Sequence, residues 1–115
     1  MDIQEPIVDK QVIVDLLYGD EDYVSEFASA SVESFTEFKD KFAKSLKTRD
    51  MESLRKAGHK IKPVAQMMKL DPVITMYETS KIMLEEDASD EEIKNLADNM
   101  NKFCTQLLKE LKQLE

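Results

Sequence analysis

At 115 residues, the chain has the length of one average domain. It carries 16 basic and 24 acidic residues, a net charge of −8, and 42% of its residues are hydrophobic. No run reaches the roughly 20 apolar residues of a membrane span, and the first residues lack the pattern of a secretory signal. We therefore expect one cytoplasmic domain over residues 1–115, with residues 1–7 as a leader. The single cysteine, Cys104, agrees with a reducing compartment.

Low glycine and proline content, with apolar residues at helical spacing, predicts an all-α protein. The first predicted helix covers residues from about 8 to 18 and stops at Gly19, a residue type common just after a helix end. Asp20 is the expected cap of a second helix that runs to about Lys47. Its predicted buried face consists of Val24, Ala28, Ser31, Phe35, Phe38, Phe42 and Leu46.

The third predicted helix is capped by Asp50 and carries the only histidine, His59. At about 100° per residue, its apolar residues fall within roughly 60° of the direction opposite His59. These residues are Leu54, Ala57, Ile61, Val64, Ala65 and Met68. Because a helix of this kind buries one stripe, we expect the imidazole to face water.

Positive charge is concentrated around His59. Residues 54–70 contain five basic side chains and no acidic one, so this segment carries +5 and the rest of the chain −13. A positive island in an acidic protein suits a small anionic group, about the size of one phosphate. It is too small for a nucleic-acid surface, which requires a basic domain or stripe.

Pro63 lies inside the apolar pattern of this third helix. Because proline has no N–H, the carbonyl of His59 loses its usual partner four residues on. The helix could end near Lys62 and restart at Pro63, or continue with a kink. The apolar stripe keeps its phase across Pro63, which favours the continuous, kinked helix.

The last two predicted helices have clear start signals. Asp71 is the expected cap before Pro72 at the first helical position, and this helix runs to about Glu86. Ser89 and Glu92 form a capping-box pattern that begins the final helix, which ends near Leu114. The predicted buried residues are Val73, Met76, Tyr77, Ser80, Met83 and Leu84, then Ile93, Leu96, Met100, Phe103, Leu107, Leu111 and Leu114, with Cys104 beside them. Short connections predict a four-helix antiparallel up-down-up-down bundle, with the short first helix across one end.

The segment His59-Lys60-Ile61-Lys62-Pro63, with this helix order, resembles histidine-containing phosphotransfer (HPt) domains. Their signature is a histidine, any residue, an aliphatic residue, a lysine and a glycine or small residue, which places His59, Ile61 and Lys62 on the motif. Two positions depart from the pattern: Pro63 replaces the usual glycine, and Lys69 stands where another glycine is common. The resemblance implies that His59 accepts a phosphoryl group.

The implied function is a phosphorelay protein that carries the phosphoryl group between receiver-domain aspartates of hybrid histidine kinases and response regulators. An imidazole is partly neutral near pH 7 and can attack phosphorus without a separate base. We expect Lys62, Arg55, Lys56 and Gln66 to support the phosphoryl group, and Lys60, Pro63 and Met67 to contribute to partner docking.

No cofactor or metal ligand set is predicted in this chain, and a monomer suffices. The chain has no ATP-binding motif, so it is expected to be a phosphocarrier and not an enzyme. The alternative is an HPt-like helical module that binds receiver or kinase domains without being phosphorylated, with Pro63 marking the loss of transfer.

Overall fold

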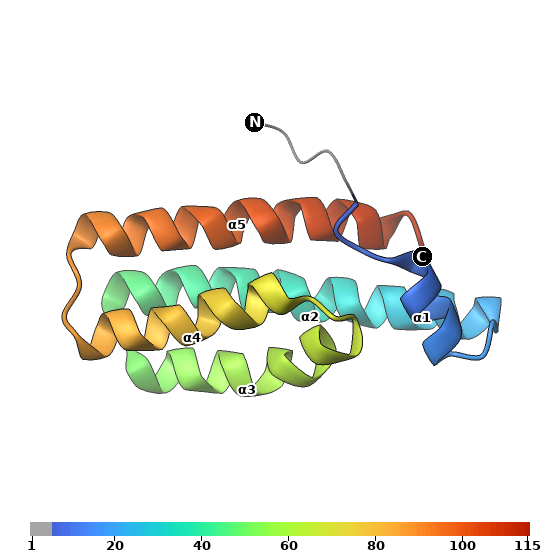
Figure 1. The fold of residues 1–115 in the computed structure, drawn as a ribbon, viewed down its shortest axis with the longest axis horizontal. Coiled ribbons are helices and arrows are strands. Elements are labelled where there is room, and N and C mark those ends of the chain that lie inside the picture. Colours follow the sequence, from blue (N-terminus) through green and yellow to red (C-terminus); the bar gives the residue numbers. More distant parts are fainter. Residues whose placement is uncertain (1–5) are drawn as a thin grey trace.

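The computed structural model describes residues 6–115, and this part of the chain is all-helical, with five helices and no strand (Figure 1). The predicted all-α class is confirmed. The helices are α1 (Lys10–Leu16), α2 (Glu21–Thr48), α3 (Met51–Met67), α4 (Asp71–Glu85) and α5 (Asp90–Lys112).

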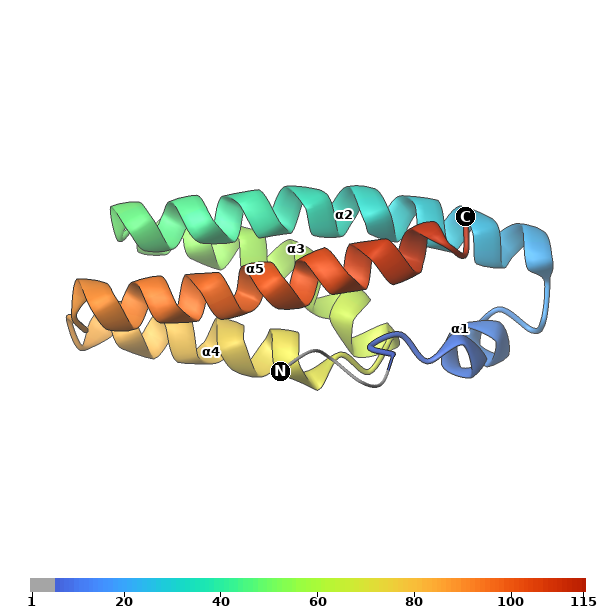
Figure 2. The same ribbon diagram turned by 90° about the horizontal axis from the view of Figure 1, so that it is seen from above.

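The four longer helices share one apolar core. Helix α2 packs against both α3 and α5, and α4 packs against the same two helices from the other side. Figures 1 and 2 show them running alongside one another, with consecutive helices joined at alternate ends of the molecule. The short α1 contacts α2 near the end at which α2 begins. The molecule is elongated, measuring 46 × 31 × 18 Å.

Helix α2 follows the sequence prediction closely. The side chain of Asp20 accepts hydrogen bonds from the backbone N–H groups of Asp22 and Tyr23, which fixes the start of the helix. All seven residues of the predicted face are buried. Phe35, Phe42 and Leu46 are among the largest fully enclosed side chains, so this helix anchors the core.

Helix α3 is continuous through Pro63, as the unbroken apolar phase predicted. Asp50 caps it by accepting a hydrogen bond from the Ser53 N–H. The predicted apolar stripe is buried except for Val64, which is half-buried. The stripe is therefore the face that packs on the core, and the opposite face is exposed.

Helix ends depart from the prediction in two places. Helix α1 ends at Leu16, before the predicted end, because Tyr18 already takes a left-handed backbone (φ 57°) and the Gly19 N–H bonds back to the Val14 carbonyl. Asp71 does not cap α4 but is its first helical residue, and the residue before it provides no side-chain cap. Lys69 also has a left-handed backbone (φ 56°), a conformation that favours glycine.

The segment before α1 is attached to α5 by one carboxylate. Glu110 accepts hydrogen bonds from the Ile7 N–H at 3.1 Å and the Val8 N–H at 2.7 Å. Partial burial acts to raise the pKa of Glu110, but these bonds and one from Gln106 lower it overall. Val8 is buried, so the predicted leader ends in an ordered contact; residues 1–5 of that leader lie outside the described residues.

Helix α5 begins as predicted, with the Ser89 side chain accepting from the Glu92 N–H. The buried seam includes Met100, Leu107 and Leu111, while Phe103 and Leu114 are half-buried. Cys104 is fully buried, and burial raises its pKa to about 12. Over residues 6–115, no helix combines the length and apolar character that crossing a membrane requires.

Candidate functional site

His59 lies in the middle of α3 and its side chain is exposed, as the helical pattern predicted. Its position opposite the buried stripe leaves one side of the ring open to a second molecule. Within residues 6–115, no group forms a hydrogen bond with the imidazole. Both ring nitrogens are therefore available for chemistry with an incoming group.

The residue before His59 is held against α4 by a close contact that the prediction missed. Gly58 is buried, and a methyl group at this position would overlap the ring and hydroxyl of Tyr77. Tyr77 is 5% exposed, so its ring has little room to move away. Only glycine therefore allows Tyr77 to pack on the backbone at this turn, which sets the distance between α3 and α4 beside His59. A glycine inside a helix is the one sequence signal that pointed to this contact.

Lys62 is on the same side of α3 as His59, about 60° around the helix axis. Its ammonium nitrogen lies 3.4 Å from Glu78 Oε1 on α4, and both side chains are 43% exposed. The other oxygen of Glu78 is 3.1 Å from Lys81 Nζ, and Lys81 also lies over the Tyr77 ring. The hydrogen bond from Lys81, supported by Lys62, lowers the pKa of Glu78. Lys62 is therefore positioned near His59 by a carboxylate that it shares with Lys81.

Three of the four remaining cations of the predicted positive island are also paired, and Lys69 forms no ion pair with the described residues. Arg55 lies 3.8 Å from Glu85 on α4, Lys56 lies 3.3 Å from Glu52 one turn earlier, and Lys60 lies 3.5 Å from Glu37 on α2. Residues 54–70 themselves contain no acidic residue, but helix packing brings Glu85, Glu37 and Glu78 of other helices beside this segment. These pairs are exposed, so each stabilises the fold weakly and can be exchanged for another anion.

Three further residues of the predicted site lie on the outer surface of α3. Pro63 and Gln66 are exposed, and Met67 is 44% exposed at the end of the helix. Gln66 does not hydrogen-bond the imidazole, so its predicted role depends on a phosphoryl group that would lie between them. Met67 offers apolar surface two turns from His59.

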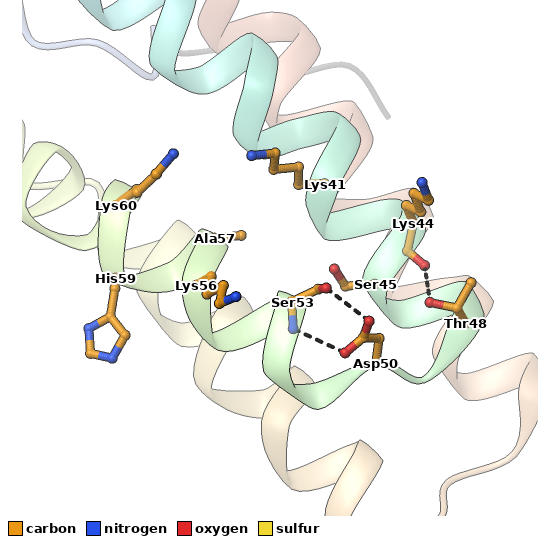
Figure 3. Close-up of a pocket in the computed structure, with 10 residues that line it drawn as sticks. All are labelled: Lys41, Lys44, Ser45, Thr48, Asp50, Ser53, Lys56, Ala57, His59 and Lys60. Atoms are coloured by element: carbon orange, nitrogen blue, oxygen red, sulfur yellow. Dashed lines mark hydrogen bonds between the residues drawn. The ribbon is translucent and has the colours of Figure 1, made fainter.

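Helix α2 contributes lysines that the sequence prediction did not connect with His59. Lys41 and Lys44 border a groove of about 440 Å³ between α2 and α3, opposite Lys56 and Lys60 (Figure 3). Glu37 lies at its margin, 2.7 Å from Lys41 and 3.5 Å from Lys60. The hydrogen bond from Lys41 is the main cause that lowers the pKa of Glu37. His59 stands at the end of this groove with its ring directed away from α2.

Among the described residues, no three His, Cys, Asp or Glu side chains are grouped so that they could hold a metal ion. The acidic residues near His59 are instead each engaged with a lysine or arginine. The exposed imidazole of His59 therefore lies among paired cations of α3, with Lys60 toward α2 and Lys62 toward α4.

Comparison with known protein families, with curated proteins and with solved structures found no match to this chain.

Proposed function

We propose that the protein is a phosphorelay histidine phosphotransfer protein that carries a phosphoryl group on His59 between receiver-domain aspartates. The observation that carries this proposal is the exposed imidazole in the middle of α3, opposite the buried stripe, with Lys62 on the same side. A nucleophile on a protruding helix surface can reach an aspartate at the bottom of a partner's active site. A histidine inside a cleft could not.

The order and packing of the helices support the same proposal. We interpret α2 to α5 as a four-helix antiparallel up-down-up-down bundle with α1 as the short extra helix, the architecture that the HPt resemblance implies. A rigid bundle suits phosphoryl transfer, because the reaction depends on in-line positioning and on neutralising oxygen charge. In this proposal the protein is a cytoplasmic monomer that acts as a phosphocarrier and has no catalytic activity of its own.

The proposed transfer is a displacement at phosphorus. A ring nitrogen of His59 attacks the aspartyl phosphate of a receiver domain, the N–P bond forms, and the bond from phosphorus to the aspartate oxygen breaks. The aspartate leaves as a carboxylate, and the proton on the other ring nitrogen can pass to water. Lys62 neutralises phosphoryl oxygen charge once it exchanges Glu78 for the phosphoryl group, with Arg55 and Lys56 adding to the local potential.

A transfer assay tests the proposal. The protein is incubated with phosphorylated receiver domains encoded in the same genome, and radiolabel on each chain is followed by gel electrophoresis. Label should appear on the wild-type chain and be absent from His59→Gln. Because this chain has a single histidine, any label retained by His59→Gln would overturn the assignment.

Pro63 supports one alternative, a helical module that binds receiver or kinase domains without accepting phosphate. Proline replaces a small residue one turn from His59 and is exposed, so it occupies surface that a docking partner would approach. The alternative predicts complex formation with no labelled histidine and no change in affinity for His59→Gln. The carrier proposal predicts labelling that depends on His59.

A further inference from the structure

The groove between α2 and α3 has the size and lining of a small-molecule site. It measures about 440 Å³, which falls within the roughly 300 to 1,000 Å³ typical of ligand pockets. It lies between the C-terminal half of α2 and the N-terminal half of α3, with Ala57 and the buried Ser45 on its inner side. Figure 3 shows Lys41 and Lys60 reaching toward one another across its upper edge.

The charge of the lining is positive although the whole chain is acidic. Four ammonium groups border the groove, from Lys41, Lys44, Lys56 and Lys60, against one carboxylate. That carboxylate, Asp50, is occupied as the cap of α3. Its two oxygens accept hydrogen bonds from the N–H and the hydroxyl of Ser53, and the N–H bond is the main cause that lowers its pKa.

The existing ion pairs leave this positive charge available. Lys41 and Lys60 share one carboxylate, that of Glu37, and Lys56 pairs with Glu52 while 75% exposed. Lys44 forms no ion pair within the part of the chain that the structure describes. Exposed pairs of this kind contribute about 1 kcal/mol or less. An anion with several charges can therefore replace them by contacting several lysines at once.

The uncharged residues of the groove narrow the class of ligand. Ser45 is 3% exposed, and no hydrogen bond joins its hydroxyl to the other residues drawn in Figure 3, so this group can bond to a ligand. Apart from His59, whose ring is directed away from α2, the lining has no aromatic ring. Nucleobases are commonly held by stacking on aromatic side chains, and this groove offers no such platform.

We propose that the α2–α3 groove binds a small, multiply charged phosphate compound without an aromatic group, such as an oligophosphate or a phosphorylated polyol. The lysines of both helices neutralise the phosphate oxygens, and Ser45 bonds to the part of the ligand nearest the core. The groove borders the proposed transfer site, since Lys56 and His59 line it as well, but binding of the anion does not require phosphoryl transfer to His59. The groove is concave and has acidic residues at its margin, which favours a soluble anion over a membrane surface.

Calorimetric titration with inorganic triphosphate tests the proposal. Binding to the wild-type protein should be saturable with one site and should weaken with added salt. The double variant Lys41→Gln/Lys44→Gln should bind about tenfold more weakly, since each exposed charge contact contributes up to about fivefold. The matched control is Lys47→Gln/Lys94→Gln, which removes the same charge from the surface between α2 and α5 and should change affinity less than about twofold.

Further measurements distinguish this groove from the His59 surface and from a general attraction to anions. The titration uses the unphosphorylated wild-type protein, so its outcome is independent of whether His59 carries phosphate in the relay. All variants alter exposed side chains, and circular dichroism should confirm an unchanged helix content. The proposal is overturned by an absence of saturable binding, or by equal weakening in the two double variants. It is also overturned by ATP binding more tightly than triphosphate, or by binding to vesicles of anionic phospholipid in place of triphosphate.

Discussion

The two flanks of α3 beside His59 are built differently. On the flank toward α4, Tyr77 packs on the backbone of Gly58 and Glu78 holds Lys62, so the helices are in close contact. On the flank toward α2, lysines from both helices border an open groove whose ion pairs are exposed.

If His59 accepts a phosphoryl group as proposed, the two flanks meet two different requirements of the transfer. Close packing on the α4 flank fixes the position of the turn that carries His59 relative to α4. On the open α2 flank, the lysines supply positive charge, and their exposed ion pairs do not hold any one of them in a single position. We therefore expect substitutions toward α4 to change stability and the position of His59, and substitutions toward α2 to change the affinity for anions.

The largest expected change comes from Pro63, on the exposed ridge between the flanks. Pro63→Ala restores an N–H that can bond to the His59 carbonyl, and interior proline costs a helix about 3 kcal/mol. Part of this gain is offset because alanine leaves the unfolded chain more freedom, by about 0.4 to 1 kcal/mol. We expect a stabilisation of about 2 kcal/mol, measured by urea unfolding. A variant no more stable than the wild type would contradict this cost of Pro63 to the helix.

The next largest change tests the α4 flank. Gly58→Ala places a methyl group against Tyr77, and overpacking costs about 1 to 3 kcal/mol. Because alanine favours a helix over glycine by about 1 kcal/mol, we expect a net destabilisation of up to about 2 kcal/mol in urea unfolding.

Gln66→Ala is the matched control, since Gln66 is exposed on the same helix. Its free energy of unfolding should stay within about 0.5 kcal/mol of the wild type. If Gly58→Ala is instead more stable than the wild type, helix propensity outweighs the contact with Tyr77, and the α4 flank is looser than described.

The pair between Lys62 and Glu78 predicts two functional effects of opposite sign. Lys62→Gln removes the cation proposed to neutralise the phosphoryl oxygens and should slow phosphoryl transfer to His59. Glu78→Gln frees Lys62 to contact the phosphoryl group and should speed transfer. Because an exposed ion pair contributes about 1 kcal/mol, either substitution should change the transfer rate by no more than about fivefold. Rapid-quench transfer kinetics would measure both, and a loss of rate in both variants would mean that Glu78 is needed to position Lys62.

The smallest expected effect is the dependence of stability on pH. Hydrogen bonds from lysine lower the pKa of Glu37 and Glu78 below 4.5, so both are easier to ionise in the folded protein. Their contribution to stability is full above about pH 4.5 and is lost as the pH falls through the lower folded-state pKa. Between pH 6 and pH 3, the thermal midpoint should fall less for Glu37→Gln/Glu78→Gln than for the wild type. An equal fall of the thermal midpoint in the two proteins would contradict a contribution of these ion pairs to stability.

The sequence was most informative where a property follows from one helix alone. The buried face of α2, the Asp50 cap and the outward direction of His59 all depend on spacing along a single helix. The continuity of α3 through Pro63 was also predictable, since the phase of its apolar residues is intact.

The sequence was less informative where two helices meet. Glu37, Glu78 and Glu85 pair with three of the cations of α3. Each lies on another helix, and the pairing depends on how the helices are rotated about their axes. The α2–α3 groove was missed for the same reason. Two predicted helix ends were wrong for local reasons. Tyr18 takes a left-handed backbone one residue before Gly19, and Asp71 is the first residue of α4, the helix that it was expected to cap.

Phosphorus-31 NMR tests the central claim most directly, after the protein has been incubated with a phosphorylated receiver domain and repurified. Phosphoryl transfer to His59 should give a signal in the phosphoramidate region, which disappears on acidification and is absent from His59→Gln. A protein that binds the receiver yet shows no signal from phosphorus bonded to nitrogen would contradict it.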